Sequence, residues 1–170
     1  MYKEYKKIKK QLIFFGILTS LLFYFNLFDF NPIREELNKN ITEEAKEASE
    51  KTRVSYVVDG DTIEIESGKR VRLIGINTPE KNEYYFEEAT NKMKELLSGR
   101  EVILVKDISE FDKYGRLLRY VYVDGVFVNE LMVSEGYAEA VEYYPDLKYR
   151  QKFNKAELYA RSNKLGIWFK

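Results

Sequence analysis

The sequence predicts an α+β fold, mainly a five-stranded β-barrel with about three helices, preceded by an N-terminal transmembrane helix. Three observations carry this prediction. An uncharged apolar run lies near the N-terminus, short β-rich runs separated by turn residues begin at residue 54, and three segments between and after these runs are predicted to be helices.

Residues 11–28 form the apolar run, which would reach about 27 Å as a helix, close to the thickness of a bilayer core. Residues 1–10 carry five lysines and one glutamate, a basic flank typical of the cytoplasmic side. We therefore predict a cytoplasmic flank at 1–10 and a retained signal-anchor at 11–30, with the rest of the chain outside the cytoplasm. A cleaved signal peptide, which would give a secreted protein, and a buried soluble helix are the alternatives.

Residues 31–52 are predicted to be a charged linker. Pro32 ends the apolar run, and the segment that follows is rich in Glu and Lys with only a loose helical stripe. The globular domain is then expected at 53–170.

Eight segments within this domain have the spacing of regular elements. The order is three strands, a helix, two strands and two helices, at 54–58, 62–66, 70–76, 84–98, 101–106, 117–123, 129–134 and about 147–163. Five short strands with a helix after the third predict a small closed barrel of the OB type with helices packed against it.

The composition excludes several kinds of chemistry. The chain has no cysteine and no histidine, which rules out thiolate nucleophiles, Cys-ligated metals, the Ser-His-Asp triad and an imidazole base. Basic and acidic residues balance at 28 each, and from residue 54 onward there are 18 basic and 20 acidic residues. Any nucleic-acid binding must therefore come from a local patch.

The segment 57–80 holds the first candidate site residues. Asp59-Gly60 is ordinary hairpin chemistry, but a turn needs one acidic residue, and the second, Asp61, could instead bind a hard cation such as Ca²⁺. Arg70 and Arg72 share one strand face, where Arg70 is expected to be solvated and Arg72 could contact a phosphate.

The turn Asn77-Thr78-Pro79-Glu80 ends the third strand. A turn that only terminates the strand would need no further explanation. In the functional interpretation, Asn77 and the Thr78 carbonyl face a cation and Glu80 faces a water, for which a carboxylate is the natural general base in a chain without histidine.

The polar turn 112–116 (DKYGR) is the last candidate. A charged hairpin loop is the simpler interpretation. The functional one is a second phosphate clamp, in which Arg116 supplies charge, Lys113 attracts the anion and Tyr114 stacks or donates a hydrogen bond.

These motifs together resemble the staphylococcal-nuclease-like, or thermonuclease, family. DGDT, RLIGINTPE, DKYGR, VNELMVSEGYA and a terminal LGIW occur in the family's order over about residues 54–169. The resemblance implies an OB-fold barrel with three helices and Ca²⁺-dependent hydrolysis of DNA and RNA. It implies no protein partner.

By motif, the resemblance implies roles for ten residues. The cation ligands would be Asp61, Asn77 and the Thr78 carbonyl. The catalytic residues would be Glu80 as general base, with Arg72 and Arg116 stabilising the transition state. Lys113, Tyr114, Tyr143 and Tyr144 would contact the substrate.

The chain departs from the family pattern at two points. Asn77 stands where the family has a second aspartate, so the site loses a negative charge and should bind its cation more weakly. Only three residues separate Glu80 from the predicted helix, so the family's long mobile loop is expected to be short.

Three functions remain open from sequence alone. The first is a membrane-anchored, calcium-dependent nuclease acting outside the cytoplasm. The second is a non-catalytic OB-fold module that binds single-stranded nucleic acid, which Asn77 favours. The third is a surface scaffold whose charges are merely solvated.

Overall fold

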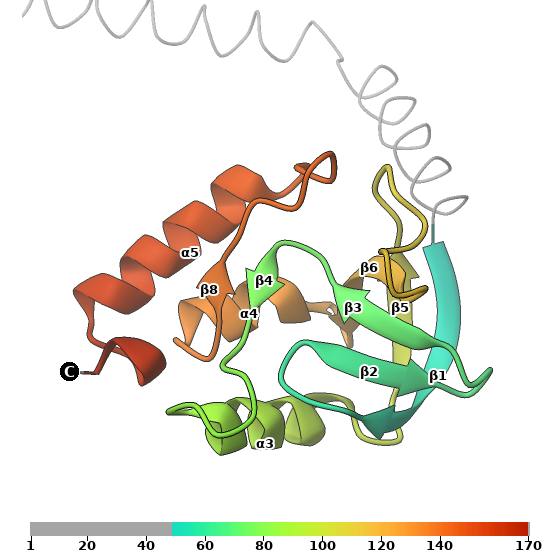
Figure 1. Ribbon diagram of the computed structural model, residues 1–170, viewed down its shortest axis with the longest axis horizontal. Coiled ribbons are helices and arrows are strands. Elements are labelled where there is room, and N and C mark those ends of the chain that lie inside the picture. The colour runs from blue at the N-terminus through green and yellow to red at the C-terminus, as the bar shows by residue number, and fades with distance from the viewer. Residues whose placement is uncertain (1–48, 170) are drawn as a thin grey trace, which may run out of the picture. The chain divides into compact units, whose positions relative to one another are not determined.

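A computed structural model of the chain describes residues 49–169 (Figure 1). The elements are β1 (Ser49–Val57), β2 (Thr62–Ile65), β3 (Arg70–Leu73), β4 (Ile76–Asn77), α3 (Phe86–Leu97), β5 (Glu101–Val105), β6 (Leu117–Val123), β7 (Val126–Phe127), α4 (Val128–Ser134), β8 (Glu139–Ala140), α5 (Arg150–Ser162) and the 3-10 helix η1 (Gly166–Trp168).

Five of the strands close into a barrel. The order is β3-β2-β1-β5-β6, and β3 also pairs with β6. The closing pair is parallel, with Val71 opposite Leu117 and Leu73 opposite Arg119, whereas the other pairs of this ring are antiparallel. The predicted five-stranded barrel with three helices is therefore confirmed.

β1 belongs to both sides of the barrel. Residues 49–53 pair with β5, and residues 54–57 pair with β2 across a register shift between Val54 and Tyr56. A bulge of this kind bends a strand so that it can serve two partners. The strand begins at Ser49 rather than at the expected residue 54, because its polar first half is fixed by pairing with β5 and not by its own hydrophobicity.

Two of the three helices bury apolar residues that recur at helical spacing. α3 buries Ala89, Met93 and Leu97, and α5 buries Phe153, Ala156 and Ala160. Figure 1 shows α3 along one end of the barrel, and α4 contacts α5. α5 begins at Arg150, later than predicted, because Asp146 accepts hydrogen bonds from the amides of Ile108 and Ser109 instead of starting the helix.

The third predicted strand, at 70–76, is broken in two. Gly75 has φ +77°, a conformation that favours glycine, and separates β3 from the two-residue β4. β4 leaves the barrel and pairs with β8, placing Asn77 opposite Glu139. The two-residue strands β7 and β8 were not predicted because each is too short to show alternation.

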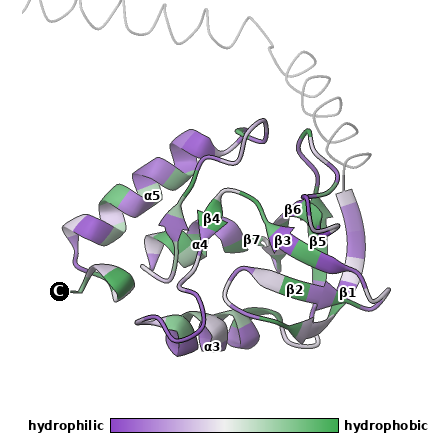
Figure 2. Cartoon of the chain, in the orientation of Figure 1, coloured by the Kyte–Doolittle hydropathy of each residue, from purple (hydrophilic) through white to green (hydrophobic). Residues whose placement is uncertain are grey.

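The apolar interior divides into two clusters. The larger fills the barrel and the helix contacts, and the smaller is aromatic and joins Tyr120, Phe127 and Phe153 to Ile74 and Leu118. Figure 2 shows hydrophobic residues on the strands and hydrophilic residues over much of α5. Both clusters contain residues of the barrel strands and of α5, so each joins that helix to the barrel.

The predicted flank 1–10, the transmembrane segment 11–30 and residues 31–48 of the predicted linker lie outside the described residues. Within residues 49–169, no helix has the length and apolar composition needed to cross a membrane.

Candidate functional site

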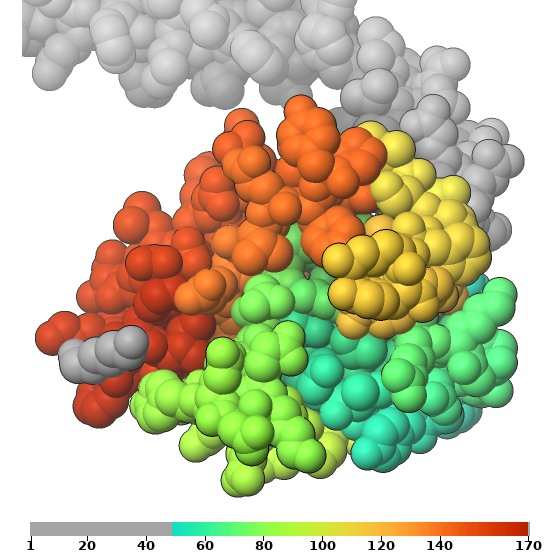
Figure 3. All heavy atoms as spheres, viewed as in Figure 1, coloured from blue at the N-terminus to red at the C-terminus, as the bar shows by residue number. Residues whose placement is uncertain are grey.

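Barrel closure brings the three candidate segments to one place. Thr62 pairs with Arg72 in the β2–β3 hairpin, and Arg72 lies opposite Leu118 of β6, just after the 112–116 loop. Figure 3 shows this loop, in yellow, next to the green segment that follows β3. The sequence motifs at 59–62, 72–80 and 112–116 are thus neighbours in the fold.

Asp61 is the centre of a set of hydrogen-bonded residues that we call the Asp61 group: Asp61, Thr62, Arg72, Asn77 and Thr78. Its Oδ2 accepts hydrogen bonds from Arg72 Nη2 at 3.0 Å, the Thr78 amide at 3.0 Å and Thr78 Oγ1 at 3.2 Å, and its Oδ1 accepts one from Thr62 Oγ1 at 3.0 Å. The carboxylate is buried, with a residue exposure of 6%. Both oxygens of this buried carboxylate therefore have hydrogen-bond partners.

The first aspartate of DGDT serves the turn. Asp59 Oδ1 accepts a hydrogen bond from the Asp61 amide at 3.0 Å. Burial, and next the charge of Asp61, raise the pKa of Asp59 above its ordinary value. Gly60 lies against Thr78, where a Cβ atom would come within 2.8 Å of Thr78 Oγ1, so glycine permits the contact between Thr78 and Asp61.

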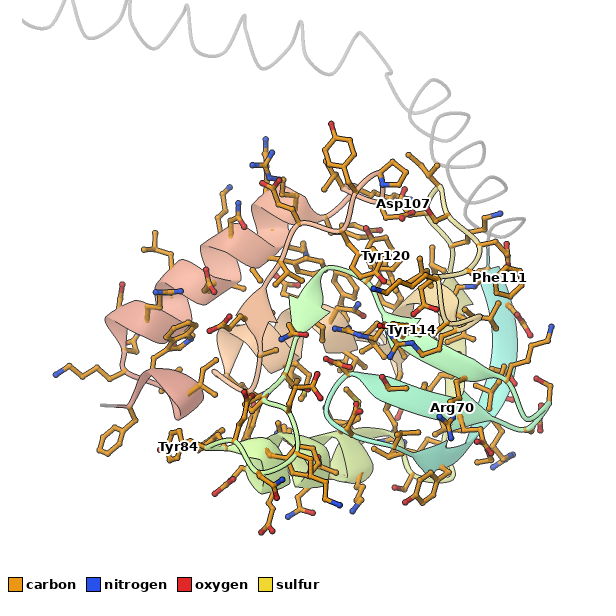
Figure 4. All side chains as sticks on the ribbon, viewed as in Figure 1. Arg70, Tyr84, Asp107, Phe111, Tyr114 and Tyr120 are labelled. Carbon is orange, nitrogen blue, oxygen red and sulfur yellow. The ribbon has the colours of Figure 1, made fainter. Side chains whose placement is uncertain are left out.

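Arg72 and Arg70 differ as predicted. The Arg72 guanidinium is buried and donates hydrogen bonds to the Leu73 carbonyl at 2.6 Å and to Asn77 Oδ1 at 3.1 Å. The Arg70 side chain is 60% exposed, and its nearest carboxylate is Glu64 at 4.0 Å. Figure 4 shows Arg70 on the sheet away from Tyr114. Arg72 is therefore the arginine of β3 that is held in the site.

The oxygens of Asp61 and Asn77 gather around one nitrogen. Arg72 Nη2 lies 3.0 Å from Asp61 Oδ2 and 3.1 Å from Asn77 Oδ1. With the Thr78 carbonyl, which is predicted to face the same cation, they would make an all-oxygen set of the kind that Ca²⁺ prefers. Such a set fits a hard cation, although Asp61 is the sole carboxylate of the three candidate ligands and no group of three acidic side chains converges within the described part of the chain.

Glu80 is exposed on the turn before α3. Its amide donates a hydrogen bond to Glu83 Oε2 at 2.7 Å, and its carbonyl accepts one from the Glu83 amide at 2.9 Å. Among residues 49–169, its carboxylate has no ion pair within 4.0 Å and no hydrogen-bond partner. The structure thus joins Asp61, Arg72, Asn77 and Thr78 directly, and leaves Glu80 free beside them in the chain. α3 starts at Phe86, so the connecting loop is short.

The 112–116 loop is organised by Asp112. Its Oδ1 accepts hydrogen bonds from the amides of Tyr114 at 2.8 Å and Arg116 at 3.0 Å, and its Oδ2 accepts one from Arg116 Nε at 2.6 Å. Burial alone would raise the pKa of Asp112, but these hydrogen bonds outweigh burial and hold the pKa below its usual value. Asp112 therefore fixes the direction in which Arg116 points.

Arg116 is the link between the loop and the Asp61 group. With Nε held by Asp112, its Nη1 reaches Thr62 Oγ1 at 3.4 Å. Lys113 and Tyr114 are exposed beside it, with Lys113 Nζ 4.9 Å and Arg116 Cζ 5.4 Å from the centre of the Tyr114 ring. The loop thus carries three groups that suit an anionic ligand with a flat ring.

The predicted substrate tyrosines are not hydrogen-bonded to the other candidate residues. Tyr143 packs against the aromatic cluster, and Tyr144, which precedes a cis-proline, is 80% exposed. Neither has a hydrogen bond to Arg116 or to the Asp61 group. Their contact with substrate therefore stays a prediction.

A cleft beside the Asn77-Thr78 turn contains residues that the sequence did not single out. It has a volume of about 560 Å³ and is lined by Asn77, Thr78, Pro79, Glu83, Tyr84, Glu139, Ile167 and Trp168. Glu139 comes from β8, which pairs with β4. The sequence carried no signal for this pairing, because both strands have two residues.

The chain is similar in sequence to a known protein family and to several endonucleases. A family model described as "Staphylococcal nuclease homologue" matches residues 70–170. Endonuclease YncB of Bacillus subtilis (strain 168) is 43% identical over 124 residues, 66% of this chain and 59% of that protein. The SPbeta prophage-derived endonuclease YokF of the same strain is equally identical over 124 residues, which make up 42% of its length.

Thermonuclease of Staphylococcus hyicus is similar over more of its own length. It is 37% identical over 131 residues, which are 71% of this chain and 78% of that protein. The chain spans about half the length of the two Bacillus relatives. The family-model match, residues 70–170, includes Arg72, the Asn77-Thr78 turn and the 112–116 loop, and it begins after Asp61.

Proposed function

The chain belongs to the staphylococcal nuclease homologue family, and from this membership we propose that it is a nuclease that hydrolyses phosphodiester bonds of DNA and RNA. One structural observation supports the proposal most strongly. A continuous set of contacts runs from Arg72 through Asp61 and Thr62 to Arg116, so that two guanidiniums are linked through a buried carboxylate. Paired guanidiniums suit a phosphodiester, whose negative charge increases in the transition state.

Ca²⁺ is the proposed cofactor. Asp61, Asn77 and the Thr78 carbonyl would hold it, and the bound ion would neutralise charge on the phosphate. The support is the all-oxygen donor set and the position of Asp61 and Asn77 around a single nitrogen of Arg72.

The chain's own residues take the remaining roles in the proposed reaction. Glu80 accepts a proton from the attacking water, whose oxygen forms a bond to phosphorus as the bond to the leaving oxygen breaks. Arg72 and Arg116 donate hydrogen bonds to the phosphoryl oxygens as charge builds on them. Lys113 and Tyr114 bind the strand beside the reacting phosphate. Tyr143 and Tyr144 are proposed to contact the substrate further from it.

The proposed location is a membrane, with the catalytic domain outside the cytoplasm. The support is the apolar run at 11–28 and the five lysines that precede it. Protease treatment of intact cells tests this, because an external domain is digested and a cytoplasmic one is protected.

A non-catalytic module that binds single-stranded nucleic acid is the second candidate. Asn77 favours it, because a neutral amide leaves Asp61 as the sole carboxylate of the proposed cation site. The two candidates predict the same binding and differ in cleavage.

The deciding experiment measures hydrolysis of single-stranded DNA by the whole chain in Ca²⁺ and in EDTA. We expect cleavage that requires Ca²⁺, and a fall in kcat of about 10² to 10³ for Arg72→Ala and for Arg116→Ala. Arg70→Ala is the matched control, because Arg70 lies two residues from Arg72 on the same strand and is exposed. Glu80→Gln should also reduce kcat.

The outcomes separate the candidates. Strand binding without measurable cleavage at any Ca²⁺ concentration would favour the binding module. Equal cleavage in Ca²⁺ and EDTA would remove Ca²⁺ from the proposal. Loss of activity in Arg70→Ala equal to that in Arg72→Ala would show that the effect is one of net charge.

A further inference from the structure

We propose that the groove between α4 and α5 is a second binding site for single-stranded nucleic acid, separate from the Asp61 group. The inference rests on the proposed nuclease function only for the identity of the strand, since binding can be measured without cleavage. None of the residues that line the groove belongs to the candidate site described above.

Charge is strongly segregated along the domain. Residues 147–164 contain six basic residues and one acidic residue, whereas residues 49–146 contain thirteen basic and twenty acidic residues. The basic segment is α5 with its flanking turns. A polyanion approaching an otherwise acidic domain would therefore be drawn to α5.

The charge lines a hollow in the surface. A groove of about 660 Å³ lies between the helices, and its lining includes Lys148, Lys152, Lys155, Tyr149 and Tyr159 from the α5 side and Glu130 from α4. The combination of a basic groove with aromatic side chains is the one that binds single strands without regard to sequence.

Two of the three lysines are available to a ligand. Lys152 Nζ pairs with Glu130 at 3.0 Å. Lys148 and Lys155 have no carboxylate within 4.0 Å among the described residues. Both line the same groove, so a strand bound there would bring its phosphates to two ammonium groups that have no ion pair within residues 49–169.

The two tyrosines differ in exposure and in their ring contacts. Tyr149 is fixed by edge contacts with Tyr120 and Phe127, at 4.6 and 4.9 Å between ring centres, so it forms a firm wall. Tyr120 in turn donates a hydrogen bond to Asp107 at 2.8 Å, and Figure 4 shows these two side chains close together. Tyr159 is 60% exposed and offers a ring face on which a base can stack.

The test is binding of a fluorescein-labelled 15-nucleotide oligo(dT) to the whole chain in EDTA, followed by anisotropy at several salt concentrations. The variant is Lys148→Gln/Lys155→Gln. Each phosphate contact contributes about 0.7 to the slope of log K against log salt for a single strand, so we expect the slope to fall by about 1.4. Lys69→Gln/Lys94→Gln is the control, because it removes the same charge from exposed positions outside the groove and should leave the slope unchanged.

Two further variants extend the test, and a folding defect could not produce the effect expected of the first. Glu130→Gln removes the carboxylate of the groove and frees Lys152, so it should tighten binding, a gain that misfolding cannot produce. Tyr159→Ala should weaken binding about fivefold or more through lost stacking.

The possible outcomes distinguish a failure of the groove proposal from a failure of the proposed nuclease function. Equal slopes for the groove variant and its control would overturn the groove, even if the protein cleaves DNA. Groove-dependent binding without cleavage would overturn the nuclease and leave the groove in place. If Lys148→Gln/Lys155→Gln loses binding to vesicles of phosphatidylserine and phosphatidylcholine but keeps its binding to oligo(dT), the groove is a lipid site and the proposal is wrong.

Discussion

Asn77 carries a neutral amide, where an aspartate would carry a charged carboxylate of nearly the same shape. Its Oδ1 lies 3.1 Å from the Arg72 nitrogen that also contacts Asp61. We predict that Asn77→Asp raises Ca²⁺ affinity roughly tenfold, because affinity at oxygen sites rises with the number of charged ligands. Calorimetric titration of the whole chain with Ca²⁺ measures the change.

Asn91→Asp provides the control for this substitution. Asn91 is exposed on α3, so the same charge is added away from the ligand set. Unchanged or weaker affinity in Asn77→Asp would place Asn77 outside the ligand shell, with the new carboxylate held by Arg72 alone.

Single residues were predictable where a motif has fixed spacing. Asp61, Arg72 and Arg116 stand in short motifs that identify them, and the structure links all three. Asn129 is different. It is fully buried, accepts a hydrogen bond from the Val121 amide and donates one to the Ile74 carbonyl, 55 residues away, at 2.9 Å each. Spacing along a chain cannot reveal a role that depends on so distant a partner.

At the scale of elements, the 112–116 loop is held by one carboxylate. We predict that Asp112→Asn lowers the free energy of unfolding at pH 7 by about 1–3 kcal/mol, because it removes a charged acceptor from Arg116. The folded-state pKa of Asp112 is lowered, so its contribution is fully present above the unfolded value of about 3.8 and is lost as pH falls through the folded pKa. Urea unfolding at pH 7 and in steps below pH 4 measures the effect.

The difference between wild type and Asp112→Asn should therefore shrink as the pH falls below about 3.8. Asp124→Asn is the comparison, because Asp124 pairs with Arg100 at an exposed position and should contribute little at any pH. If the loss of unfolding free energy in Asp112→Asn stays constant down to pH 2, the charge of the Asp112 carboxylate is not what stabilises this loop.

Elements were predictable where they carry their own periodicity. The strands of the barrel and the buried faces of α3 and α5 repeat apolar residues at their natural spacing. β4, β7 and β8 have two residues each, and α5 starts late because Asp146 is used by the 108–109 amides. These details depend on tertiary contacts, which override local preference.

For the whole molecule, Gly75 is where the barrel meets α5. A Cβ atom there would come within 2.5 Å of the Phe153 ring, and its φ of +77° already disfavours other residues. We predict that Gly75→Ala lowers the free energy of unfolding by about 2–4 kcal/mol through backbone strain and overpacking together. Urea unfolding of the whole chain measures it.

A double-mutant cycle separates the two causes. Phe153→Leu gives the new methyl group room, so Gly75→Ala should cost less in that background, with a coupling of about 0.5–3 kcal/mol. Gly99→Ala, at a similar φ of +69° but with open space around it, reports the backbone cost alone. Full additivity of Gly75→Ala and Phe153→Leu would mean that the two residues do not press on each other.

The parallel pairing of β3 with β6 has a consequence for the time at which the protein becomes active. Arg72 and Arg116 are 44 residues apart in the chain, and they come together when β6 closes the barrel. During synthesis, or during passage through a membrane as an unfolded chain, the two halves of the proposed site exist but cannot meet. The proposed nuclease would therefore be unable to cleave nucleic acid in the cell that makes it until residue 123, the end of β6, has left the ribosome or the translocation channel and the barrel has folded.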